Sequence, residues 1–135
     1  MFTTISNTPT PALPTSLSVS QPNLLLRAEG LAFFIGSIAL YASQGFNGWV
    51  FVLLLLVPDV AMLGYLVNPR IGSLAYNIAH VYILPLLLMA LGAAGGAPFA
   101  LQLGIIWFAH ISMDRVAGYG FKYATAFKDT HMQRV

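Results

Sequence analysis

The chain has 135 residues, 58% of them hydrophobic, and carries only six Lys or Arg and four Asp or Glu side chains. A water-soluble domain is roughly 25% charged, and a small one needs this polar surface because much of it faces solvent. The composition therefore excludes a soluble globular enzyme, a disordered chain and a nucleic-acid-binding protein. The absence of cysteine excludes disulfides and thiolate metal ligands. An all-α, polytopic membrane protein is predicted.

The first stretch, residues 1–23, is rich in Ser, Thr and Pro and has no charged side chain, so we expect a flexible tail. Four apolar segments follow, each near the ~20 residues that a helix needs to cross a bilayer. Their short, turn-like junctions make neighbouring segments antiparallel. The prediction is a four-transmembrane-helix up-down bundle over 24–118 and an interfacial tail over 119–135. The predicted spans are about 24–43, 49–67, 72–92 and 98–116.

The positive charges are confined to one side of this predicted bundle. The junctions at 43–48 and 92–98 contain no charged side chain. Loops rich in Lys and Arg stay in the cytoplasm. We therefore expect both termini to be cytoplasmic and the protein to lie in the inner (plasma) membrane of the cell. The cations on this side are Arg27, Arg70, Arg115, Lys122, Lys128 and Arg134.

Polar side chains occur in every predicted span, toward its cytoplasmic end. Ionisable groups are costly inside a bilayer, so each needs a partner or a function. His110 and Asp114 are spaced i,i+4 and share a helix face, as do Asn77 and His80 at i,i+3. Two imidazoles with carboxylates form a nitrogen and oxygen ligand set that suits Zn, Mn or non-haem Fe. The candidate metal ligands are Glu29, Asp59, His80, His110 and Asp114.

Other polar residues are candidates for supporting roles at this site. An amide behind a ligating histidine orients it, and arginines bind anions bidentately where they do not simply anchor a helix at the interface. The tail is either an interfacial aromatic and basic segment or a segment that folds back so that Asp129 and His131 cover the site. The same polar set is compatible with an inert buried network, or with proton or ligand handling. The candidates for orienting and anion binding are Asn77, Arg27, Arg70 and Arg115.

Several strings of the chain resemble a family of small bacterial four-helix membrane proteins catalogued as domain of unknown function 4260. They are LLRAEGLAFF, LLVPDVAMLGYL, NPRIGSLAYNIAHVYILP, IWFAHISMDRVAGYGFKY and FKDTHMQR. The resemblance covers about residues 24–135 and implies four spans, with no agreed activity. A weaker similarity, carried by His80, His110 and Asp114, is to inner-membrane proteins labelled metal-dependent hydrolases.

Three functions are compatible with these residues. The first is a metal-dependent hydrolase acting at the cytoplasmic leaflet. The second is a non-catalytic accessory subunit of a larger membrane complex, in which an intramembrane histidine contacts a lipid or ligates a pigment or haem. The third is a small transporter, for which four short spans leave little room unless the protein forms a homo-oligomer.

Overall fold

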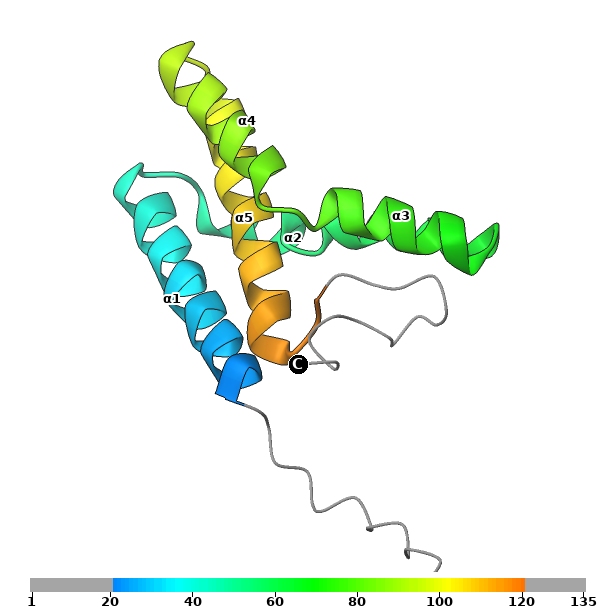
Figure 1. Ribbon diagram of the computed structural model, residues 1–135. Helices are drawn as coiled ribbons and strands as arrows, with labels where there is room; N and C mark the ends of the chain where they lie inside the picture. Colours follow the sequence, from blue (N-terminus) through cyan, green and yellow to red (C-terminus); the bar gives the residue numbers. More distant parts are fainter. Residues whose placement is uncertain (1–20, 121–135) are drawn as a thin grey trace, which may run out of the picture.

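The computed structural model describes residues 21–120, and Figure 1 shows their arrangement. This part of the chain is helical and contains no strand, which confirms the predicted all-α class. Most of the two predicted tails, at 1–20 and 121–135, lies outside the described residues. In chain order the elements are α1 (Gln21–Ser43), α2 (Gly48–Leu54), the 3₁₀ helix η1 (Val57–Leu66), α3 (Pro69–Ala79), α4 (Ile83–Ala94) and α5 (Pro98–Ala117).

Helix α5 is the central element, and α1 and α4 pack along it (Figure 1). Helix α5 contains more buried residues than any other helix of the described chain, among them Ile105 and Ile111. Glycines allow the close approach of the flanking helices. A Cβ atom at Gly30 of α1 would lie 2.6 Å from Cβ of Arg115, and one at Gly104 of α5 would lie 2.5 Å from Cγ of Met89 in α4.

The second apolar segment is not one continuous helix, as the sequence analysis predicts, but two. Helix α2 ends at Leu54 and η1 begins at Val57. Pro58 has no backbone N–H to continue the α-helical ladder, and the N–H of Asp59 donates instead to the carbonyl of Leu56 at 3.1 Å, a 3₁₀ bond. A 3₁₀ helix as long as η1 is uncommon and typically marks a strained or functional region.

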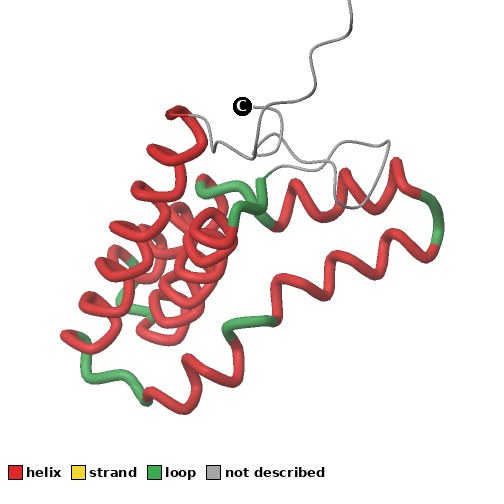
Figure 2. The backbone as a smooth tube through the Cα atoms, turned by 90° about the horizontal axis from the view of Figure 1, so that it is seen from below, coloured by secondary structure: helices red, strands yellow, loops and turns green. Residues whose placement is uncertain are grey.

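The third apolar segment is broken in the same way. Helix α3 ends at Ala79, and His80 caps it by donating its N–H to the carbonyl of Asn77 at 3.2 Å. Pro85, in the first turn of α4, cannot donate to the carbonyl of Val81, so the helix cannot run through this point. As a result α3 turns away from α4 and lies beside η1 (Figures 1 and 2).

The pair formed by η1 and α3, called here the hairpin, projects from the three packed helices α1, α4 and α5 (Figure 2). Its two arms approach closely where glycines face each other: a Cβ atom at Gly64 would lie 3.1 Å from Cα of Gly72. Asn68 begins α3 by accepting the N–H of Ile71 at 2.8 Å, directly before Pro69. The hairpin departs from a simple up-down bundle because of the two helix breaks.

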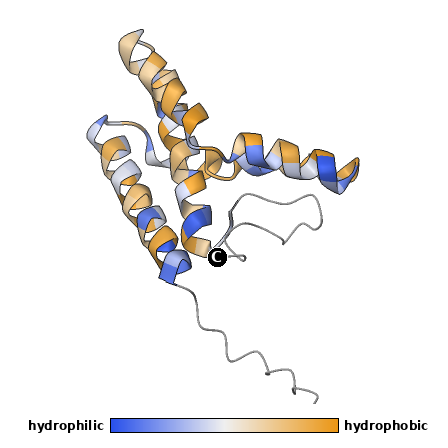
Figure 3. Ribbon diagram, viewed as in Figure 1, coloured by the Kyte–Doolittle hydropathy of each residue, from blue (hydrophilic) through white to orange (hydrophobic). Residues whose placement is uncertain are grey.

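Three helical stretches are long and apolar enough to cross a membrane, Gln21–Ser43, Gly48–Leu66 and Pro69–Ala94. They contain the first three predicted spans, and Figure 3 shows the hydrophobic residues along them. Helix α5, the predicted fourth span, is not among the three because polar residues such as Gln102 and Asp114 lower its hydropathy. Helices α1 and α4 pack along α5 and cover part of its surface, so its polar side chains need not face lipid.

Candidate metal centre

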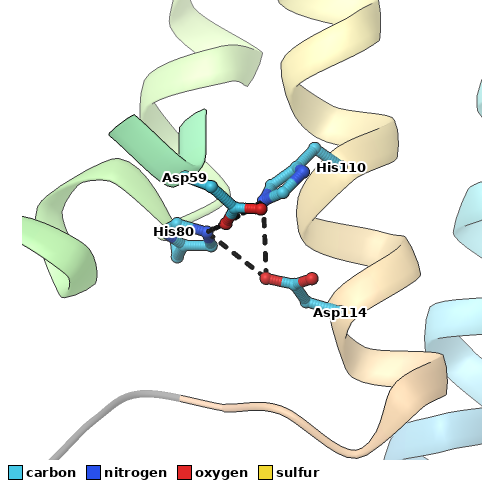
Figure 4. Close-up of side chains that lie close together, drawn as sticks. All are labelled: Asp59, His80, His110 and Asp114. Carbon is cyan, nitrogen blue, oxygen red and sulfur yellow. Dashed lines mark hydrogen bonds and ion pairs between the residues drawn. The ribbon is translucent and has the colours of Figure 1, made fainter. Parts of the chain in front are cut away.

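Four of the predicted ligands meet at one point (Figure 4). Asp59 lies in the first turn of η1, His80 caps α3, and His110 and Asp114 lie one turn apart on α5. One potential ligand atom from each residue lies within 4.8 Å of the others. Both histidine side chains are fully buried, whereas the side chains of Asp114 and Asp59 are 13% and 33% exposed. The cluster is therefore closed on the histidine side and most accessible at Asp59.

The spacing of these atoms is that of a coordination shell. The Nε2 atoms of His80 and His110 are 2.9 Å apart. Each Nε2 lies 3.2–3.5 Å from Asp59 Oδ1 and from Asp114 Oδ2. Tetrahedral coordination at the ~2.0–2.1 Å typical of zinc places ligand atoms about 3.3–3.4 Å apart. The four nitrogen–oxygen separations match this value, whereas the nitrogen–nitrogen separation of 2.9 Å is shorter, so the cluster is compatible with a tetrahedral ion and also with a hydrogen-bonded polar network.

Tyr76 holds the His80 ring in the orientation a metal ligand needs. The carbonyl of Tyr76 lies 2.7 Å from Nδ1 of His80. A carbonyl only accepts, so Nδ1 carries the proton and Nε2 of the neutral ring keeps its lone pair. The Tyr76 ring also stacks on the imidazole, with centroids 3.7 Å apart and an angle of 12°. The His80 lone pair therefore points toward His110.

The two ligand residues on α5, His110 and Asp114, differ in the contacts that hold their side chains. The hydroxyl of Tyr76 donates to Asp114 Oδ2 at 3.0 Å, which fixes that carboxylate. Nδ1 of His110 is buried and makes no hydrogen bond of normal geometry, although the backbone of Leu55 interacts with this imidazole. Leu55 lies in the break between α2 and η1. The helix break thus supplies both a ligand, Asp59, and the backbone beside a second one.

The break between α3 and α4 is tied to α5 by two side chains. Nη2 of Arg115 donates to the carbonyl of His80 at 3.4 Å, and its Nη1 donates to the carbonyl of Tyr119 at 2.9 Å. Nε1 of Trp107 donates to the carbonyl of Ala79 at 2.5 Å. Carbonyls freed at a helix end must find donors within a membrane. These bonds therefore stabilise the backbone that carries His80.

A sequence model of the family described as Domain of unknown function (DUF4260) matches residues 23–135. The chain belongs to this family. The match includes the whole of the metal-site cluster and confirms the family resemblance noted from the sequence. Comparisons with curated proteins and with solved structures found no match.

Glu29, the fifth predicted ligand, is not brought into the cluster. It lies exposed on α1, and the neighbouring residue Gly30 is the one that faces α5. Successive helical residues point about 100° apart, so the contact through Gly30 directs Glu29 elsewhere. The sequence predicts Glu29 as a ligand because it lies near the same helix end as the other candidates. The rotation of α1 about its axis points Glu29 away from the cluster and excludes it as a ligand.

The predicted supporting residues are dispersed. Arg70 is exposed at the far end of α3 from His80, about 15 Å along the helix axis, because the hairpin turns outward. Nε of Arg27 donates to Asn23 Oδ1 at 2.9 Å, and its guanidinium packs against Gly118. Asn77 contributes its backbone carbonyl to the His80 cap.

Asp129 and His131 lie outside the described residues. Sequence reasoning missed two residues that position the centre, Tyr76 and Trp107. Tyr76 precedes His80 by four residues, so helical periodicity alone places both on one face.

Proposed function

We propose that this protein is an integral metallohydrolase of the inner membrane with four spans and cytoplasmic termini. Three spans are the apolar stretches Gln21–Ser43, Gly48–Leu66 and Pro69–Ala94, and α5 is the fourth, shielded by α1 and α4. The loops at 43–48 and 92–98 carry no charge, whereas Arg27 and Arg115 lie near the opposite ends of α1 and α5. The positive-inside rule supports this orientation.

The observation that carries the proposal is the spacing of the four ligand atoms. Their four nitrogen–oxygen separations of 3.2–3.5 Å are compatible with a tetrahedral ion at zinc-like distances, and the nitrogen and oxygen ligand set suits Zn, Mn or non-haem Fe. Charge supports the same ion. Two aspartates and two neutral histidines carry a charge of −2, which a divalent cation neutralises, so that no net charge has to be buried inside the bilayer.

The difference in exposure divides the four residues into two roles. Catalytic zinc sites hold the metal with three protein ligands and keep the fourth position for water or substrate. His80, His110 and Asp114 are the more deeply buried three, and Tyr76 orients two of them. Asp59 is the most exposed member and follows Pro58 at a helix break. His80, His110 and Asp114 would therefore hold the metal, and Asp59 would accept a proton from water at the accessible side.

Zinc in such a site polarises a carbonyl and makes a bound water nucleophilic near neutral pH. The residues of this chain supply the rest of the chemistry. The two buried histidines exclude solvent from the inner side, and the Asp59 carboxylate takes the proton of a water at the accessible side. The reaction class that this arrangement supports is hydrolysis.

Metal content of the purified protein tests the proposal. Protein extracted in mild detergent without chelator should contain about one zinc per chain by elemental analysis, and a His80→Ala, His110→Ala double variant should contain none. Asp59→Asn should keep the metal and lose hydrolysis, because Asn still coordinates weakly but cannot accept a proton. Glu29→Gln is the matched control: an acidic residue of a neighbouring helix, outside the cluster, whose loss should leave zinc content unchanged.

The wild-type protein also provides a direct titration. After removal of metal with a chelator, added zinc should bind once per chain, more tightly than manganese or iron. A wild-type protein that neither retains nor rebinds any of these ions would refute the metal centre and favour the inert polar network. Equal zinc content in the double variant would show that the metal binds elsewhere.

A further inference from the structure

A half-open apolar pocket of about 370 Å³ is lined by residues that neighbour three of the four cluster residues along the chain. Every residue that lines it is hydrophobic, and residues from α2, η1, α3, α4 and α5 contribute to its wall. The residues that carry the argument are Pro58, Ala79, Leu88, Leu103, Ile106 and Trp107, which define the acyl pocket.

The acyl pocket is lined by residues that lie next to the ligand residues in the sequence or one turn from them on α5, although none of the four ligand residues lines it. Pro58 directly precedes Asp59, and Ala79 directly precedes His80. Ile106 and Trp107 lie four and three residues before His110, one helical turn or about 5.4 Å along α5. The bond from Trp107 Nε1 to the carbonyl of Ala79 at 2.5 Å leaves the apolar part of the indole to form the wall.

Polarity changes in order along α5. Leu103, Ile106 and Trp107 line the pocket, His110 belongs to the centre one turn later, and Asp114 follows after another turn. A molecule lying along this helix meets hydrocarbon first, then the ligand atoms, then the polar helix end. This order is the order of an amphiphile: a hydrocarbon chain, a reactive carbonyl and a polar group.

We propose, on the basis of the hydrolase function above, that the acyl pocket binds the single hydrocarbon chain of a fatty acyl ester, whose carbonyl lies at the metal centre. In the reaction the oxygen of water adds to the carbonyl carbon and the bond from that carbon to the ester oxygen breaks. The alcohol leaves with one proton of the water, and the chain leaves as the carboxylic acid. Asp59, next to the pocket residue Pro58, carries the proton between them.

The size of the pocket sets the length of the chain. A water molecule takes about 30 Å³ in the liquid and a methylene group is of similar size, so the pocket has room for about a dozen methylene groups. This volume holds one chain of about that length, so the proposal is for one hydrocarbon chain in the pocket. For chains that partition from water, each added methylene should increase affinity about fourfold.

The fluorescence of Trp107 reports binding of a ligand in the acyl pocket without an activity assay. The chain contains two tryptophans, and the other, Trp49, is exposed on α2. A fatty acid methyl ester with a brominated chain quenches tryptophan on contact, so Trp49→Phe protein held in amphipol should show saturable quenching of Trp107. Trp107→Phe protein, in which Trp49 remains, is the matched control and should show only weak, non-saturating quenching.

Unbrominated methyl esters should reverse the quenching of Trp107, about fourfold more tightly per methylene and levelling off near twelve carbons. Leu88→Phe with Leu103→Phe narrows the pocket and should move this limit to shorter chains. Quenching of Trp107 that is no stronger than that of Trp49, has no chain-length limit, or occurs only with a brominated two-chain phospholipid would overturn the proposal.

The metal measurement on the same preparations separates the two proposals. Protein that binds zinc but shows no saturable quenching would refute the acyl pocket and leave the metal centre intact. Protein that shows saturable quenching but binds no zinc would refute the hydrolase and reduce the pocket to a lipid contact, which also overturns the present inference.

Discussion

A Tyr76→Phe substitution removes a single oxygen atom beside the metal centre. The hydroxyl donates to Asp114 Oδ2 at 3.0 Å, whereas the ring stacks on His80 at 3.7 Å and the main-chain carbonyl accepts from His80 Nδ1. Phenylalanine keeps the ring and the carbonyl, so the substitution isolates the hydrogen bond to the carboxylate. The residue is almost fully buried, and the freed carboxylate oxygen cannot gain an equivalent bond from bulk water.

The expected loss of zinc affinity can be calculated in two ways. Hydrogen bonds to charged groups contribute about 1.5–3 kcal/mol, which corresponds to roughly 10- to 100-fold in an equilibrium constant. Loss of a residue that orients a metal ligand typically costs 10- to 100-fold in metal affinity. Both values predict that Tyr76→Phe binds zinc about 10- to 100-fold more weakly than the wild type.

The assay is a competition titration of metal-free protein against a chelating zinc indicator in detergent. Tyr82→Phe is the matched control because its hydroxyl donates to Ser112 Oγ at 3.3 Å and touches none of the four ligand residues. Zinc affinity should be unchanged in this variant. If Tyr76→Phe binds zinc within twofold of the wild type, Asp114 does not depend on Tyr76 and the geometry has been misread. Equal losses in both variants would point to general destabilisation.

Three further predictions concern stability and metal linkage. Gly30→Ala should lower the free energy of unfolding by about 1–3 kcal/mol, because the added Cβ would lie 2.6 Å from Cβ of Arg115. Gly36→Ala is the control, since no atom lies within 4 Å of its added Cβ, and it should leave the free energy of unfolding unchanged or raise it. Thermal unfolding measures both. Zinc at 100 times its dissociation constant should stabilise the protein by about 2.7 kcal/mol, seen as a higher thermal midpoint, and the His80→Ala, His110→Ala variant should show no such increase. Zinc affinity should fall as pH is lowered because protons compete for the imidazole and carboxylate atoms; an affinity that does not change with pH in the same titration would exclude histidine ligation.

The helices and the candidate ligands differ in how well the sequence predicts them. Apolar length and turn-like junctions locate the four apolar segments between residues 21 and 117, but not the breaks that divide the second and third segments into two helices each. Hydropathy does not distinguish an α-helix from a 3₁₀ helix of the same residues, so the long η1 is not foreseen even though Pro58 is visible. The consequence for the site is large, because the break at Pro58 sets the position of Asp59.

Depth along a helix is easily read from sequence, but rotation about its axis is not. Asp59, His80, His110 and Asp114 were grouped by depth and the structure brings them together. Glu29 shares this depth but faces away, because the contact of Gly30 with α5 sets the rotation of α1. Arg70 is predicted from sequence to bind an anion at the site. The turn at His80 carries it to the far end of the hairpin.

The origin of the four ligand residues has a mechanical consequence. Asp59 and His80 belong to the hairpin, whereas His110 and Asp114 belong to α5, and each arm of the hairpin packs chiefly against the other arm. An ion held by all four residues is therefore also a cross-link between two bodies that share few other contacts. Its removal leaves the hairpin joined to α5 by the hydrogen bonds from Tyr76 to Asp114, from Trp107 to Ala79 and from Arg115 to His80, and by the two helix breaks. Zinc binding should therefore reduce the local opening of the hairpin, and amide hydrogen exchange in η1 should be slower in the zinc-bound protein than in the metal-free protein.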